Sequence, residues 1–180
     1  MMSPKIIPVT LFGKHPSSSE YLNLGEPSPF MSSVTEWVEK GFETSLQNRA
    51  LKHTPKIQHF SFFNDKKESM ICGSMTLSQD RRGRKYPLLI AVEITEYATL
   101  FNPYEALAFS KAISQKIVKI FQKSCDLEML KDELERLSIY EPLRSQDEEM
   151  ASSILMSEDF SEARLFYRPL ELTDFITSMR

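Results

Sequence analysis

The sequence lacks the features that mark membrane, secreted or disulfide-bonded proteins. It has no apolar run approaching about 18 residues, which excludes a membrane-spanning helix. Residues 1–5 carry neither a long apolar segment nor a small-residue cleavage site, so we expect no secretory signal and a cytoplasmic location. Two cysteines, Cys72 and Cys125, are too few for a disulfide scaffold and lack metal-ligand spacing. Each is expected to be a small buried hydrophobe.

The patterns of common cofactor and metal sites are missing as well. Gly13-Lys14 follows a predicted strand, but Pro8 stands where a phosphate-binding loop needs glycine, and His15 stands where it needs Ser or Thr. His53 and His59 do not have the i, i+4 spacing of helical zinc ligands. We therefore expect no metal and no cofactor.

The charge is distributed unevenly along the chain. The net charge is −3, yet the segment 126–159 holds eleven acids and three bases, whereas residues 1–86 hold twelve bases and eight acids. The acidic segment is either a solvated helical face or a second candidate interaction face. A nucleic-acid partner is not expected, because the cluster Arg81–Lys85 alone offers too few phosphate contacts.

The most distinctive segment runs from Gly73 to Leu88, where a polar turn lies between two apolar segments. Ser78 and Asp80 are residue types that cap turns, Gly83 supplies the backbone freedom of a tight reversal, and Pro87 is expected to open the next strand. Asp80 is expected to accept backbone N–H groups and to pair with Arg84 or Arg82. The remaining guanidinium groups would then project outward as donors for carboxylate or phosphate.

Two separate motifs in this order resemble the TagF (ImpM) family, accessory proteins of bacterial type VI secretion. The first is the pattern Ser-x-Asp-x-x-Gly-Arg-x-Tyr-Pro-Leu, filled by Ser78, Asp80, Gly83, Arg84, Tyr86, Pro87 and Leu88. The second is the segment 11–17, Leu-Phe-Gly-Lys-His-Pro-Ser, which resembles the opening motif of the family; Trp37, Pro55 and Phe60 also match family positions. The chain departs from the family at Ser19-Glu20-Tyr21, where Gly-Asp-Phe is usual.

The periodicity of the apolar residues predicts a layered domain. Strands are expected over about 6–12, 57–63, 70–77, 88–94 and 163–168, with a loop up to about residue 29 and a polar connection over 141–158. Helices are expected over 28–47, capped by Ser28, over 103–122, and over 127–137 and 170–179. The fold class is α/β: one domain over 1–180, with a mixed or largely antiparallel sheet flanked by helices. Its motifs lie in about 6–95 and its helical, acidic part in about 103–180.

The resemblance implies a non-enzymatic regulator of type VI secretion, a post-translational repressor that binds and sequesters a forkhead-associated scaffold protein. The predicted contact residues are Lys14, Pro16, Asp80, Arg81, Arg82, Arg84 and Tyr86, with Ser78, Gly83 and Pro87 shaping the turn. One alternative is a small hydrolase or transferase that uses Asp80, Arg84 and His15, which lies beside Ser17, although no glycine-flanked nucleophile is present. Another is a structural subunit of the secretion baseplate.

Overall fold

The computed structural model describes residues 9–47, 57–64, 66, 69–95, 103–122, 126–135, 153–156 and 163–166. The strands are β1 (Val9–Gly13), β2 (Leu22–Leu24), β3 (Ile57–Phe63), β4 (Ser69–Gln79), β5 (Lys85–Thr95), β6 (Ser153–Met156) and β7 (Ala163–Phe166). The helices are α1 (Pro29–Gln47), α2 (Pro103–Gln122) and α3 (Leu127–Glu135). The predicted helix over 170–179 lies outside the described residues.

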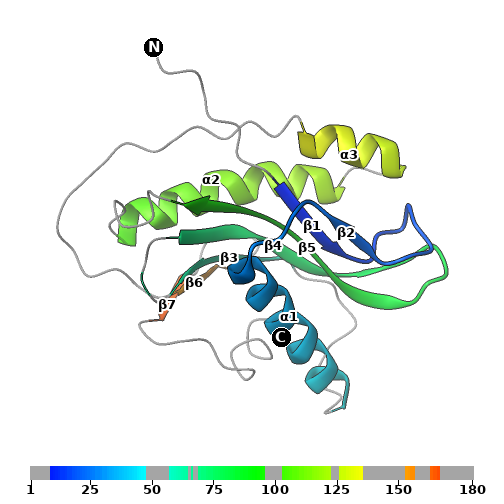
Figure 1. The fold of residues 1–180 in the computed structure, drawn as a ribbon, viewed down its shortest axis with the longest axis horizontal. Helices are drawn as coiled ribbons and strands as arrows, with labels where there is room; N and C mark the ends of the chain where they lie inside the picture. Colours follow the sequence, from blue (N-terminus) through cyan, green and yellow to red (C-terminus); the bar gives the residue numbers. More distant parts are fainter. Residues whose placement is uncertain are drawn as a thin grey trace.

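The strands form one seven-stranded sheet in the order β2-β1-β5-β4-β3-β6-β7 (Figure 1). Every neighbouring pair is antiparallel. The α/β class is therefore confirmed. Of the two predicted kinds of sheet, mixed or largely antiparallel, the described strands form the antiparallel one. The predicted meander of β3, β4 and β5 forms the centre of the sheet.

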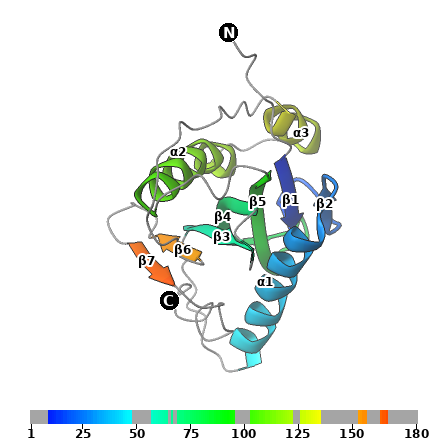
Figure 2. The same cartoon turned by 60° about the vertical axis from the view of Figure 1, so that its left-hand side comes forward.

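The two long helices cover opposite faces of the sheet, as the rotated view in Figure 2 shows. Strand β5 lies between them, which explains its apolar run: every side chain from Leu88 to Val92 is buried. On the sheet face that α2 covers, the helix contributes the buried side chains of Ile113 and Ile117. There the Ser114 hydroxyl donates a hydrogen bond to the Gly73 carbonyl at 3.1 Å.

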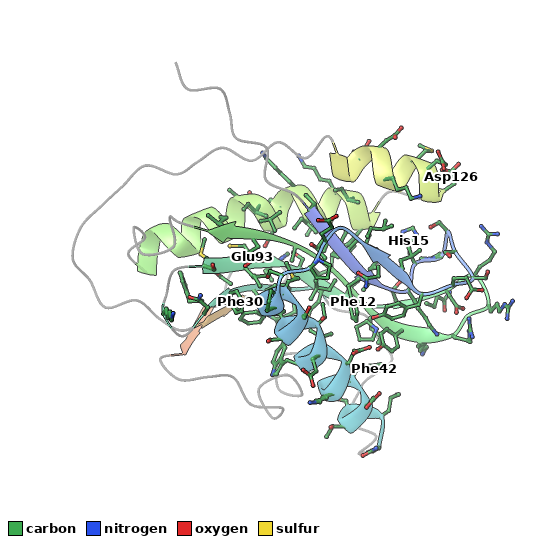
Figure 3. The ribbon with its side chains drawn as sticks, in the orientation of Figure 1. Phe12, His15, Phe30, Phe42, Glu93 and Asp126 are labelled. Atoms are coloured by element: carbon green, nitrogen blue, oxygen red, sulfur yellow. The ribbon has the colours of Figure 1, made fainter. Side chains whose placement is uncertain are left out.

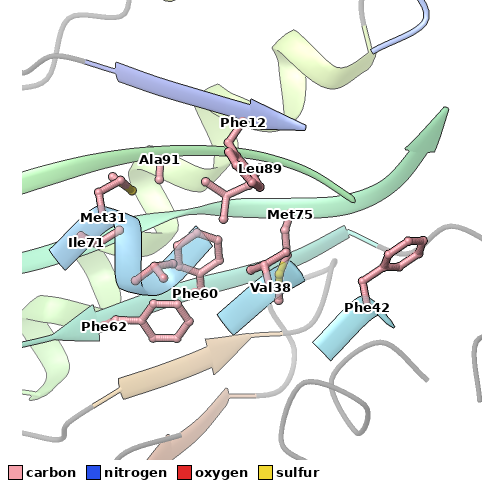
Figure 4. Close-up of a cluster of buried hydrophobic side chains, with 11 residues drawn as sticks. Phe12, Met31, Val38, Phe42, Phe60, Phe62, Ile71, Met75, Leu89 and Ala91 are labelled. Atoms are coloured by element: carbon pink, nitrogen blue, oxygen red, sulfur yellow. The ribbon is translucent and has the colours of Figure 1, made fainter. Parts of the chain in front are cut away.

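Helix α1 begins and packs as the sequence predicts. The Ser28 hydroxyl accepts a hydrogen bond from the Met31 N–H at 3.0 Å, so Ser28 caps the first turn. The buried stripe of the helix, with its three- and four-residue spacing, faces the sheet and is filled by Met31, Val34, Val38 and Phe42. Figure 4 shows Met31 and Val38 of this stripe in one cluster with Phe60, Met75 and Leu89 from the strands.

The structure corrects several predicted boundaries. Strand β4 ends at Gln79, so Ser78 lies within this strand and pairs with Tyr86. Strand β5 begins at Lys85, so Pro87 lies inside this strand and does not open it. Segment 22–24, expected to be loop, pairs with β1 as β2, and segment 153–156, expected to be a polar connection, pairs with β3 as β6. Both strands are short, and pairing with a longer neighbour stabilises them more than their own sequence does.

Candidate functional site

The two sequence motifs meet at one end of the sheet. Strand β1 pairs with β5 so that Gly13 lies opposite Leu88. The residues after Gly13 consequently run beside the residues before Leu88, and the loop between β1 and β2 lies next to the turn between β4 and β5 (Figure 1). The Lys14 N–H continues the ladder by donating to the Pro87 carbonyl at 3.3 Å. The N–H and C=O groups of one strand residue point to the same side of the strand. Proline has no N–H, so Pro87 can only accept a hydrogen bond on the side that faces β1, and it does so at the point where β1 ends.

Asp80 organises the turn. Its backbone N–H donates to the Arg84 carbonyl at 3.1 Å, and its carbonyl accepts from the Gly83 N–H at 2.9 Å. In the side chain, Oδ1 accepts from the backbone N–H groups of Arg82 and Arg84 at 2.9 and 3.0 Å. Oδ2 accepts from Arg84 Nε at 2.7 Å and lies 3.5 Å from Lys14 Nζ. The carboxylate thus joins the turn to the first motif.

These contacts fix the ionisation of Asp80. Burial of the side chain opposes the charge, but the hydrogen bonds from the backbone and guanidinium of Arg84 and from the backbone of Arg82 outweigh it and lower the pKa of Asp80 to about 2. A carboxylate with so low a pKa, and with both oxygens occupied, is a poor general base at neutral pH. Asp80 is therefore suited to holding the turn and not to proton transfer.

The turn also captures the serine run that follows the first motif. Three successive backbone carbonyls accept hydrogen bonds from it. Arg81 Nη2 donates to the Ser17 carbonyl at 2.6 Å, and the Arg81 backbone N–H donates to the Ser18 carbonyl at 2.8 Å. Arg84 Nη2 donates to the Ser19 carbonyl at 2.8 Å. The guanidinium group of Arg81 was expected to project outward, but it binds the neighbouring loop. Arg84 pairs with Asp80, one of the two expected pairings, and also reaches this loop.

An aromatic cluster lies beneath this loop. Tyr21 packs edge-on against Phe12 and Tyr86, with ring centroids 4.9 and 5.3 Å apart, and Tyr86 packs against Phe42 at 5.3 Å. Phe12 and Phe42 are labelled in Figure 3. Tyr21 is the aromatic residue of the segment Ser19-Glu20-Tyr21, and its ring joins this packing. The Tyr21 ring remains 38% exposed and adds an aromatic surface beside the turn.

Polar contacts fix Tyr86 at the base of this cluster. Its hydroxyl donates to Glu39 Oε1 at 2.7 Å, and Lys14 Nζ lies 5.7 Å from its ring centroid. Burial, together with the hydrogen bond to Glu39 and its charge, raises the pKa of Tyr86. Burial and the neighbouring Tyr86 and Glu39 likewise raise the pKa of Tyr21. Both phenols are therefore protonated at neutral pH, and Tyr86 ties the turn to α1.

The predicted contact residues divide into two groups. Lys14 and Asp80 are directed inward, because their side chains are only 16% and 0% exposed and face each other. Tyr86 is half-buried. By contrast, Pro16 and Arg82 are exposed, and the Arg82 side chain makes no hydrogen bond or ion pair with the residues that the structure describes.

Lys85 is the last residue of the cluster Arg81–Lys85. It is exposed, and within the described ranges its side chain has no hydrogen bond or ion pair. Six of the exposed residues around the turn are hereafter called the turn surface: Pro16, Tyr21, Arg81, Arg82, Arg84 and Lys85. Glu20 and Gly83 beside them are exposed as well.

The geometry does not favour the hydrolase alternative. His15 is buried, and its Nδ1 accepts from the Ser17 backbone N–H at 3.1 Å and lies 2.6 Å from the Ser17 hydroxyl. A catalytic histidine needs a second group to orient its ring, yet no acid in the described part of the chain is hydrogen-bonded to His15. Burial also lowers the pKa of His15, so the ring is neutral and stabilises its own loop.

Only part of the acidic segment 126–159 is described. Asp126 precedes α3 and caps it by accepting the Met129 N–H at 2.9 Å. The side chain of Asp126 and those of Glu128 and Asp132 in the helix are exposed. Figure 3 labels Asp126 at the start of this helix. Glu128 and Asp132, four residues apart, are therefore solvated on one side of α3, and the role of the acidic segment as a second interaction face stays a prediction.

Two further expectations concern metals and membranes. Among the described residues, no three side chains of His, Cys, Asp or Glu come close enough to hold a metal ion. Over the same ranges, no helix combines the length and apolar character that a bilayer crossing demands.

The loop carbonyls and Tyr21 are the site features that sequence reasoning missed. A backbone carbonyl is present at every residue, so the sequence carries no sign that those of 17–19 bind the turn. Tyr21 did carry a signal, because an aromatic side chain stands there in a polar loop after a serine run.

Comparisons with known proteins bear on the family and on the fold of this chain. A family model described as the TagF N-terminal domain, type VI secretion system-associated, matches residues 10–137. The crystal structure of PA0076 from Pseudomonas aeruginosa PAO1 superposes with a TM-score of 0.63 at 15% identity, over 95% of this chain and 76% of that chain. This likeness supports the fold alone. No curated protein matches the sequence.

Proposed function

Since the chain belongs to the TagF N-terminal domain family, which is associated with type VI secretion, we propose that it is a non-enzymatic regulator of that apparatus. In this proposal it acts in the cytoplasm as a post-translational repressor. It binds a forkhead-associated scaffold protein and keeps that protein from the site of assembly. Repression then depends on the difference in affinity between the free and the assembled scaffold.

One observation carries the proposal: both family motifs build a single, rigid and exposed turn surface. Asp80 fixes the turn, and the carbonyls of 17–19 fix the adjoining loop. Exposed Tyr and Arg side chains on a rigid support are typical of the residues that dominate protein interfaces. A preorganised surface of this kind loses little conformational entropy when a partner binds.

The chemistry of the same residues weakens the enzyme alternative. Asp80 is saturated with hydrogen bonds, and His15 is buried against its own loop. Arg84, the third residue of that alternative, binds Asp80 and the Ser19 carbonyl. The side chains of all three residues are therefore engaged in hydrogen bonds that hold the turn and its loop, which leaves none of them poised for catalysis.

The test is an affinity pull-down from the native bacterium, with the tagged chain as bait and mass spectrometry of the captured proteins. We expect the forkhead-associated scaffold to be recovered with the wild type. Recovery should be lost with Arg82→Glu and kept with Lys66→Glu, a matched charge reversal at an exposed lysine away from the turn. Stoichiometric capture of baseplate proteins without the scaffold would favour the structural-subunit alternative. Capture of no secretion component would contradict the proposal.

A further inference from the structure

We propose that the turn surface binds an acidic segment of a partner protein, and that Arg82 and Lys85 are the cations that pair with its carboxylates. This inference deepens the proposed function and rests on it for the statement that a partner binds here. It adds the chemistry of the partner segment and separates the cations that bind it from those that hold the site together.

The cations of the turn have different tasks. Lys14 and Arg84 face Asp80, and the guanidinium groups of Arg81 and Arg84 bind the carbonyls of Ser17 and Ser19. The single carboxylate inside the turn is thereby neutralised. The side chains of Arg82 and Lys85 have no acidic partner within hydrogen-bond or ion-pair distance among the described residues, and both are exposed; Asp80 contacts Arg82 only at its backbone N–H. The side chains of Arg82 and Lys85 therefore carry positive charge that no described carboxylate pairs with; the exposed acid Glu20 lies in the adjoining loop and forms no ion pair with them.

The backbone that carries these two cations is fixed before binding. The Arg82 N–H is held by Asp80 Oδ1, and the residue before Lys85 is held at its backbone N–H, carbonyl and guanidinium. Gly83, with φ of +78°, lies between them and allows the reversal. Only the two side chains lose freedom when carboxylates bind, which lowers the entropic cost of recognition.

A polypeptide fits this surface better than a nucleic acid. Affinity for nucleic acid grows with the number of phosphates that cations neutralise, and two free cations give a weak, salt-sensitive interaction. The net charge of −3 further opposes a long polyanion. A short acidic segment of a protein, in contrast, gains from the exposed Tyr21 ring and from Pro16 beside the charges.

The test uses fluorescence anisotropy with a fluorescein-labelled octaglutamate peptide and a labelled eight-nucleotide single-stranded DNA. The variant Arg82→Glu/Lys85→Glu is compared with Lys66→Glu/Lys131→Glu, which changes the net charge equally at two other exposed lysines. We expect octaglutamate to bind the wild type at low salt. Binding should weaken about tenfold or more in the turn variant and less than about twofold in the control.

Several results would overturn the inference. These are no binding of octaglutamate to the wild type, equal weakening in both double variants, or tighter binding of the DNA than of the peptide. Sedimentation of the protein alone tests a second copy as the occupant. Self-association of the wild type that the turn variant abolishes would show that the acidic segment comes from the same chain, and would also overturn the inference.

Pull-downs with the same double variants distinguish this inference from the proposed function. If wild type and turn variant recover the scaffold equally, the regulatory function stands and the acidic-segment inference fails. If the wild type recovers no secretion component while octaglutamate binding depends on Arg82 and Lys85, the binding chemistry stands and the proposed function fails.

Discussion

Gly13 is the residue whose substitution tests the architecture of the site most directly. It ends β1 with φ of +122°, a backbone conformation that residues with a Cβ rarely adopt. A Cβ built on it would lie 1.9 Å from the Pro87 carbonyl oxygen and 3.0 Å from the Leu88 Cα. Both neighbours are backbone atoms of the central strand β5, so neither can rotate away. Gly13→Ala must therefore separate the end of β1 from β5.

The cost of Gly13→Ala follows from two contributions. A residue with a Cβ in such a backbone conformation costs about 1–3 kcal/mol. Displacement of the Pro87 carbonyl removes the hydrogen bond from Lys14 and disturbs the ladder beside it, at about 1 kcal/mol for each bond. Together these give a loss of about 3–5 kcal/mol in the free energy of unfolding. For a chain of this length, that corresponds to a fall of roughly 10 °C or more in Tm.

Gly83→Ala is the matched control for this prediction. Gly83 also has a positive φ, +78°, but a Cβ there would meet no atom within 4 Å. Only the conformational cost of about 1 kcal/mol applies, which lowers Tm by about 3 °C. Thermal unfolding of both variants followed by circular dichroism measures the difference. If Gly13→Ala lowers Tm no more than Gly83→Ala, the close approach of β1 to Pro87 is not what the structure describes.

Three further predictions concern the same loop and turn. Because hydrogen bonds lower the pKa of Asp80 to about 2 from 3.8, its stabilising effect is present above pH 3.8 and is lost as pH falls through about 2. In urea unfolding, wild type should exceed Asp80→Asn in stability at pH 5, with a gap that narrows towards pH 2; a constant gap would contradict this assignment. Burial lowers the pKa of His15 below 6.5, so the unfolded chain binds the proton more readily and stability declines as pH falls below 6.5. His15→Gln should flatten that decline, and an unchanged slope would show that His15 does not cause it. Arg81→Ala removes a tie to the Ser17 carbonyl, so hydrogen exchange should accelerate in the loop 16–20, whereas Arg82→Ala should leave it unchanged. Equal acceleration in both variants would refute the division of the cations.

The sequence by itself determined the elements whose stability comes from their own residues. Helix α1 follows from the spacing of its apolar residues and from Ser28, and it begins and ends as predicted. Strand β3 has the predicted bounds, and β5 is buried on both faces because its run is apolar throughout. The pairing of Asp80 with Arg84 also followed from the turn, since the two residues are only four apart.

The tertiary structure decided what depends on distant partners. Strands β2 and β6 have three and four residues, too few for a pattern of their own, and they form because β1 and β3 offer them an edge. The outward or inward role of each cation likewise depended on the loop 17–19. Its carbonyls accept from Arg81 and Arg84, whereas the Arg82 side chain has no hydrogen-bond or ion-pair partner among the described residues. Residue type specifies that an arginine donates hydrogen bonds, but only the fold specifies which acceptor lies within reach.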